Sequence, residues 1–328
     1  MNMRFVIPVL AIAALQSIQG AAAEPLALLR TIQMPQVQGR IDHLTMDAAE
    51  QRLFVAALGN DTVEVLDTRA GTVLRSLAGF HEPQGIGQPL AGDVVAVANG
   101  GSGDVVLLDR ASFRVIRSVP LGDDADNVRF DSATRRFYVG YGSGAIAAVS
   151  EDGARAGEVR LSGHPESFQL ESKGSRIYVN VPDARHIAVI DRAGMKLQTT
   201  WPVTTASANY PMALDEDGHR LFVGCRRPAK VLVYDTATGK ETGAFAIVGD
   251  TDDMFYDAKR KRLYVAGGEG FIDVFDGSQT GSVNRLARIA TAAGARTALL
   301  VPAEDRLYLA VPRRGSQPAE IRVYAVRD

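Results

Sequence analysis

The chain has 328 residues, with 36 Lys and Arg against 38 Asp and Glu, and its formal net charge is −2. This balance excludes the basic surplus that is usual in nucleic-acid-binding proteins, so we expect no nucleic-acid partner. A single cysteine excludes an intramolecular disulfide framework, so the hydrophobic core must hold the fold together.

Residues 1–23 have the composition of a secretory signal peptide. A short basic start precedes an apolar run of 11 residues, 5–15, and the three alanines 21–23. A membrane-spanning helix needs about 20 apolar residues, so we expect no membrane span after removal of this segment. The pattern predicts cleavage between Ala23 and Glu24, a single mature domain of residues 24–328, and a periplasmic or secreted location.

The rest of the chain consists of repeats. The clearest repeated segment alternates apolar and aromatic residues, and in six of seven copies it begins with Arg. Equivalent positions are 40 to 44 residues apart, at Val55, Val97, Val139, Val179, Val223, Val265 and Leu309. Repeats of this length are typical of a β-propeller with one blade per repeat.

Each repeat has four strand patterns separated by polar turns; in the first repeat they cover residues 41–47, 52–56, 62–67 and 73–77. The seventh repeat has only three, and residues 26–34 supply the fourth. We therefore predict an all-β, seven-bladed propeller with four antiparallel strands per blade, the last blade being closed by the N-terminal strand. Aspartates that we expect to cap turns recur after the third strand, at Asp67, Asp109, Asp191, Asp235 and Asp276.

Three segments, 53–67, 177–191 and 263–276, resemble the YVTN-repeat, or YncE-like, β-propellers. The resemblance extends over the whole mature chain and implies an exported bacterial protein that acts as a binding module. With one tryptophan, Trp201, the chain lacks the repeated tryptophans of the quinone-cofactor dehydrogenase propellers. It also lacks the Gly-His and Trp-Asp pairs of WD repeats.

The first strand of each predicted blade lines the central channel, and its equivalent positions differ between repeats. One position holds a ring of polar residues, Asp42, Gln84, Asp126, Glu166, Tyr210, Asp252 and Arg296. Packing between repeats explains a shared residue type but not seven different polar ones. We expect a ligand site here, with a channel that is polar only because it is wet as the alternative.

The residues expected to contact a ligand are Arg40, Asp42, His43, Glu82, Gln84, Asp126, Asn127, His164, Glu166, Asn209, Tyr210, Asp252 and Arg296. Converging oxygen ligands suit Ca²⁺, Mg²⁺ or Mn²⁺, and the metal ligands would be Asp42, Asn127, Glu166 and Asp252. The histidines His43, His81 and His164 would instead favour Zn²⁺ or Cu²⁺. Arginines in the loops 224–228 and 312–315 are further candidates for contacting an anionic ligand.

Two functions follow from this pattern, and the sequence leaves open whether the protein is an enzyme. In the first, a periplasmic binding or scaffold protein holds a small molecule, a metal ion or a loop of a protein partner in the polar funnel. In the second, a divalent metal activates water for lactone hydrolysis, as in gluconolactonase-type propellers, with Asn209 joining the metal ligands and Asp253 as general base. A Gly-x-Ser-x-Gly motif, which would indicate a serine nucleophile, does not occur.

Overall fold

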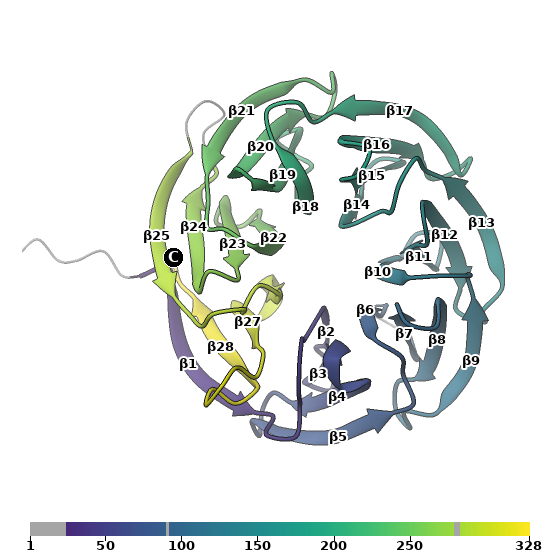
Figure 1. Cartoon of the computed structure of the whole chain (residues 1–328), viewed down its shortest axis with the longest axis vertical. Helices are drawn as coiled ribbons and strands as arrows, with labels where there is room; N and C mark the ends of the chain where they lie inside the picture. Colours follow the sequence, from purple (N-terminus) through teal and green to yellow (C-terminus); the bar gives the residue numbers. More distant parts are fainter. Residues whose placement is uncertain (1–23, 90–91, 279–282) are drawn as a thin grey trace, which may run out of the picture.

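The computed structural model describes residues 24–89, 92–278 and 283–328. They form seven four-stranded antiparallel sheets arranged like blades around a central channel (Figure 1). The only helical elements in these ranges are two short 3₁₀ turns, η1 (Leu58–Asn60) and η2 (Pro302–Glu304). The predicted all-β, seven-bladed propeller is therefore confirmed, whereas the predicted signal peptide, residues 1–23, lies outside the described residues.

The chain enters each of the first six blades at the channel and proceeds outwards. The strands of blades one to three are β2 (Leu44–Asp47), β3 (Arg52–Ala57), β4 (Thr62–Asp67), β5 (Thr72–Ala78), β6 (Pro83–Gly87), β7 (Val94–Asn99), β8 (Asp104–Asp109), β9 (Val115–Pro120), β10 (Ala125–Asp131), β11 (Arg136–Tyr141), β12 (Ala145–Ser150) and β13 (Arg155–Arg160). Those of blades four to six are β14 (Phe168–Leu170), β15 (Arg176–Val181), β16 (His186–Asp191), β17 (Lys196–Pro202), β18 (Ser207–Asp215), β19 (Arg220–Arg227), β20 (Ala229–Asp235), β21 (Glu241–Ala246), β22 (Thr251–Asp257), β23 (Arg262–Gly267), β24 (Phe271–Asp276) and β25 (Asn284–Ala290).

The seventh blade joins the two ends of the chain. Its strands β26 (Ala298–Val301), β27 (Arg306–Val311) and β28 (Glu320–Val326) come from the C-terminal segment. The outermost strand is β1 (Leu26–Gln33), which pairs antiparallel with β28 from Leu26–Val326 to Gln33–Glu320. Without β1, the edge of β28 would expose unpaired backbone groups, so the predicted closure completes the ring.

The core lies between the blades, where the second and third strands of each repeat face their neighbours. The aromatic residues of the repeated segment, including Tyr138, Tyr178 and Phe222, are fully buried there. The Arg that begins the segment covers the adjacent ring, as in Arg176 over Tyr178 at 5.3 Å. Each predicted turn aspartate accepts backbone N–H bonds within its turn; for example, Asp67 Oδ1 lies 2.7 Å from the Arg69 nitrogen.

Within the described residues, no helix has the length and apolar character needed to cross a membrane.

We expect the closure strand to contribute strongly to stability. Ile32 is fully buried in β1, so Ile32→Ala should lower the free energy of unfolding by about 2–5 kcal/mol. Leu28 lies on the same strand but is 54% exposed, and Leu28→Ala should change the free energy of unfolding by no more than about 0.5 kcal/mol. Urea denaturation of the two variants measures the difference, and equal losses would contradict a closing role for the buried face of β1.

Candidate functional site

A repeated backbone feature presents the polar ring to the channel. Two residues before the ring position, five blades have a positive φ, at Glu82, Asp124, Ala208, Asp250 and Gly294. In four blades the pairing of the first two strands is then interrupted, with register shifts between Pro83 and Ile86, Ala125 and Val128, Asn209 and Met212, and Thr251 and Asp253. Bulges of this kind redirect side chains, and here the interrupted stretches contain ring residues.

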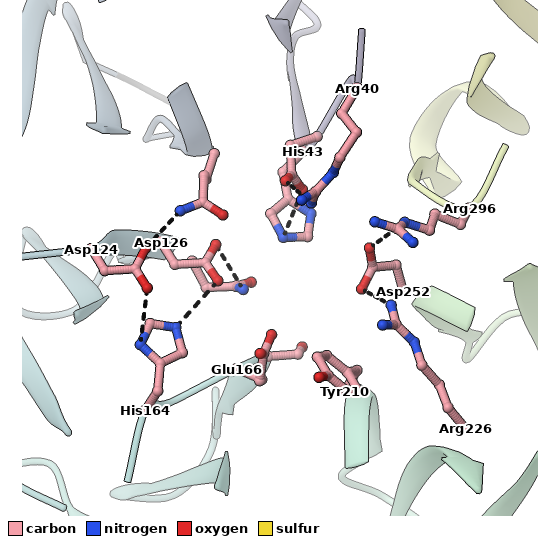
Figure 2. Close-up of a pocket in the computed structure, with 14 residues that line it drawn as sticks. Arg40, His43, Asp124, Asp126, His164, Glu166, Tyr210, Arg226, Asp252 and Arg296 are labelled. Carbon is pink, nitrogen blue, oxygen red and sulfur yellow. Dashed lines mark hydrogen bonds and ion pairs between the residues drawn. The ribbon is translucent and has the colours of Figure 1, made fainter. Parts of the chain in front are cut away.

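All seven ring residues line one cavity of about 270 Å³, which we call the funnel. The other residues that line it are Arg40, His43, Asp124, Asn127, His164, Ser167 and Arg226. Nearly all of these side chains are polar or charged. Figure 2 shows Asp252, Arg226 and Arg296 across the funnel from Asp124, Asp126 and His164.

One half of the funnel is a network of ion pairs. The Asp252 carboxylate lies 2.7 Å from Arg226 Nη2 and 2.9 Å from Arg296 Nε (Figure 2). Arg296 also reaches Asp250 at 3.0 Å, and Arg40 pairs with Asp42 at 3.0 Å. In this half, three arginines stand against the carboxylates of Asp42, Asp250 and Asp252, so the charges balance.

Arg226 lies in the loop 224–228, whose arginines the sequence offered only as further candidates for contacting an anionic ligand. Its guanidinium carbon lies 3.9 Å from the centre of the Tyr210 ring, a cation–π contact. Its Nε donates to the backbone oxygen of Thr251 at 2.8 Å. These contacts hold Arg226 beside Asp252 and fix the Tyr210 ring on the funnel wall.

The opposite half, which we call the acidic half, contains Asp124, Asp126 and Glu166, with His164 as its one cation. His164 Nδ1 donates to the Gly142 oxygen at 2.7 Å and lies 3.6 Å from Asp124, while Nε2 lies 3.7 Å from Asp126. Burial opposes the charged ring, but the bonds to Asp126 and Gly142 and the nearby charge of Asp124 raise the pKa of His164 to about 9. When all three carboxyl groups are ionised, the imidazolium balances one of their three negative charges.

Glu166 is a carboxyl group of the funnel that has no cation or hydrogen-bond donor beside it among the described residues. Among the described residues, no hydrogen bond or ion pair reaches its carboxylate, which Figure 2 shows directed into the funnel. Burial, together with the charges of Asp126 and Asp252, raises the pKa of Glu166 to about 8. The neighbouring Asn127 is 2% exposed, and its Oδ1 also has no hydrogen-bond partner. The Glu166 carboxylate is therefore available to a ligand, whereas the Asn127 Oδ1 is enclosed by the protein.

His43 forms the base of the funnel. Its ring lies 3.7 Å from Asp42 and 3.5 Å from Asp253. Burial opposes the charged form, but the attraction of Asp253 and Asp42 raises the pKa of His43 to about 10. Burial, with the charges of Asp126 and Asp252, raises the pKa of Asp42 to about 7. Asp253 also accepts a hydrogen bond from the backbone N–H of Ala298 at 2.8 Å, so its carboxylate contacts both His43 and Ala298.

Three of the noted residues lie elsewhere. Asn209 is fully buried, and its amide donates to Asn180 Oδ1 at 3.0 Å and to the His186 oxygen at 3.2 Å. Glu82 and His81 do not line the funnel. Asp124, Ser167 and Arg226 line it in addition to the expected set. Asp124 shares the position two residues before the ring with Arg40 and His164, which would have identified it. Ligand contact by any of these residues stays a prediction.

The four metal ligands named from the sequence, Asp42, Asn127, Glu166 and Asp252, all line the funnel. No group of three or more His, Cys, Asp or Glu side chains among the described residues is placed to hold a metal ion. Asp42 and Asp252 are paired with arginines instead. A bound divalent metal therefore stays an untested prediction.

Glu166 should make stability depend on pH. Its pKa rises from 4.5 to about 8 on folding, so the folded chain holds the proton more tightly, and stability is lost as pH rises from about 4.5 to about 8. Glu166→Gln cannot ionise and should be more stable than the wild type at pH 9 by on the order of 1 kcal/mol or more. Thermal unfolding at about pH 4 and about pH 9 measures this, and the difference is expected only at the higher pH. Glu50→Gln, at a 58% exposed side chain, is the control; a pH-independent effect of Glu166→Gln would contradict the assignment.

Comparison with known proteins supports the architecture. No protein-family description and no curated protein sequence matches this chain. A solved chain in the "Crystal Structure of Mitotic Checkpoint Complex" superposes with a TM-score of 0.78 at 16% identity, and the match covers 100% of both chains. At this identity the similarity concerns the fold alone. The chain therefore shares its backbone arrangement with that solved chain. It is a seven-bladed β-propeller with a charged funnel in its channel.

Proposed function

We propose that this protein is a binding protein whose funnel holds a small organic molecule with a positively charged group. The observation that carries the proposal is the carboxylate of Glu166, which lines the funnel and has no partner among the described residues. Glu166 is partly exposed to the funnel, and a ligand ammonium or guanidinium would supply the hydrogen bonds and the positive charge that the surrounding residues do not give it.

The distribution of charge supports a cation rather than an anion. The three arginines already have carboxylate partners, whereas the acidic half has an excess of carboxylates over its single imidazolium. An anion would have to displace Asp252 from Arg226 and Arg296. A cation displaces nothing at Glu166, and it favours the ionised form of a carboxyl group whose pKa is about 8.

The size of the funnel supports a small ligand. Its volume of about 270 Å³ lies just below the range of about 300–1,000 Å³ for sites that take drug-sized molecules. A ligand of a few carbon atoms with one charged group fits this volume better than a loop of a protein partner does. Binding of a loop is therefore the less favoured form of the same proposal.

The lactone-hydrolase alternative requires Asn209 at the metal and Asp253 as general base. The amide of Asn209 instead faces Asn180 and His186, and the carboxylate of Asp253 contacts Ala298 and His43. No observation of these two residues favours hydrolysis over binding, so binding is the function that we propose.

The proposed location is the periplasm, and it rests on the signal-like segment 1–23 and on the resemblance to YncE-like propellers. Expression of the full chain in a bacterial host should place it in the periplasmic fraction, with Glu24 as the first residue in N-terminal sequencing. Retention of Met1 in a cytoplasmic product would contradict the proposed export.

The ligand class can be tested by calorimetry at pH 8.5 with methylammonium, guanidinium and 1,4-diaminobutane. We expect these cations to bind and acetate or acetamide not to bind. Glu166→Gln should weaken binding by about tenfold or more, since a hydrogen bond between charged groups contributes about 1.5–3 kcal/mol. Glu50→Gln should leave binding unchanged.

The pH dependence of this binding gives a second test. A cation that binds ionised Glu166 lowers the pKa of its carboxyl group, so affinity should rise from pH 6 to pH 8.5 and protons should be released. Calorimetry in two buffers of different ionisation enthalpy measures the protons. Equal affinity for acetamide, or tighter binding of Ca²⁺, Mn²⁺ or Zn²⁺ than of any organic cation, would overturn the proposal.

A further inference from the structure

A second cavity of about 320 Å³ lies in the same channel beyond the funnel, and we call it the lower chamber. Its walls are the inner-strand residues that follow the ring positions, such as Leu44, Val128 and Met254. His43 and Ser167 line both cavities, so they form the partition between the two. The two spaces are therefore distinct sites along one axis.

The lower chamber differs from the funnel in chemistry. Ring positions are polar, whereas the lower chamber combines apolar side chains, among them Ile86, Met212 and Leu300, with polar ones. Methionine side chains are flexible and polarizable, and they adapt to ligands of different shape. This wall can bury an apolar group, which the walls of the funnel cannot.

Arg129, on β10, is the one Lys or Arg among the residues that line the lower chamber. Its Nη1 donates to the Val128 oxygen at 2.9 Å, and its guanidinium lies over the Phe168 ring at 5.6 Å. Among the described residues, no carboxylate lies within ion-pair distance of it. Burial lowers the pKa of Arg129, although Asp253 and Asp126 oppose this shift. Most of the five N–H donors of a guanidinium thus have no partner here.

Gln88 supplies a second polar group without a partner. Its side chain lines the lower chamber, and its buried Oε1 accepts no hydrogen bond. The amide can rotate to present either its oxygen or its NH₂ group. A ligand with an acceptor oxygen would find donors at Arg129, and Gln88 would add a donor only with its amide rotated to present the NH₂ group.

We propose that the lower chamber is a second binding site, separate from the funnel, for a small monocarboxylate with an apolar tail. The carboxylate accepts hydrogen bonds from Arg129, and the tail packs against Met212, Met254 and Leu300. The guanidinium balances one negative charge, since the His43 imidazolium at the partition is already paired with Asp42 and Asp253, so a dianion such as phosphate fits less well. The volume limits the tail to a short chain.

The probe is hexanoate, compared by calorimetry with hexanol and hexylammonium. Hexanoate should bind to the wild type more tightly than either analogue. Arg129→Met replaces the guanidinium by an unbranched apolar side chain and should weaken the binding of hexanoate by about tenfold or more. Arg129→Lys, which keeps the positive charge, should bind hexanoate more tightly than Arg129→Met does. Cation binding in the funnel should be the same in Arg129→Met as in the wild type, and Glu166→Gln should bind hexanoate normally.

A second variant keeps the test valid if Arg129→Met does not fold. Thr45 is half-buried on β2 and lines the chamber, so Thr45→Phe should fill it and abolish hexanoate binding while Arg129 is unchanged. Hexanol binding as tightly as hexanoate, or hexanoate binding that survives both variants, would overturn the proposal. Loss of hexanoate binding in Glu166→Gln would show that the two cavities are one site.

Discussion

The pairing of β1 with β28 is the constraint on which the rest of the structure depends. Each blade packs only against its two neighbours, so an open ring would have two unprotected faces and no defined channel radius. The N-terminal strand completes the seventh sheet, and this pairing sets the distance at which seven inner strands face one another. Residues as far apart in the chain as Arg40 and Arg296 then share one cavity.

Charge pairing decides how the funnel is organised within that ring. Asp252 lies between two arginines, and His43 lies between two aspartates. These contacts make one half of the funnel electrically neutral. Glu166 is left with its carboxylate near Asp126 and Asp252, and its raised pKa reports that imbalance. The preference for a cationic ligand that we propose follows from this difference between the two halves of the funnel. One half pairs its carboxylates with arginines, and the other half leaves Glu166 without a cation.

The polarity of the channel wall changes along its axis, because successive positions of the inner strands direct different side chains towards the channel. At the ring position, bulges and left-handed residues turn polar side chains inwards. Beyond His43 the strands regain regular pairing, and apolar side chains line the space around Arg129. One fold thus provides a strongly polar compartment and a second compartment that combines apolar and polar walls, and the ion pairs of His43 lie between them.

Repetition made much of this protein predictable from sequence. Seven copies of one pattern determine the number of blades, and the three-strand seventh repeat determines that residues 26–34 close the ring. The divergent position of the repeats identified all seven ring residues of the funnel, because equivalent positions of a symmetric fold lie at equal depth. Turn aspartates such as Asp67 were likewise evident, since their hydrogen bonds are local.

Contacts between blades were decided only by the tertiary structure. Asn209 has the spacing of a funnel residue, yet its buried amide NH₂ donates to Asn180 and His186 of the neighbouring blade, and its Oδ1 has no hydrogen-bond partner. Arg226 comes from a second strand, and it enters the funnel because Tyr210 and Asp252 hold it there. Which carboxylates find a cation, and that Glu166 finds none, depends on side-chain distances across the ring. The sequence determined which residues reach the channel, and the closed ring decided which of them pair, because pairing acts between chain segments that meet only after folding.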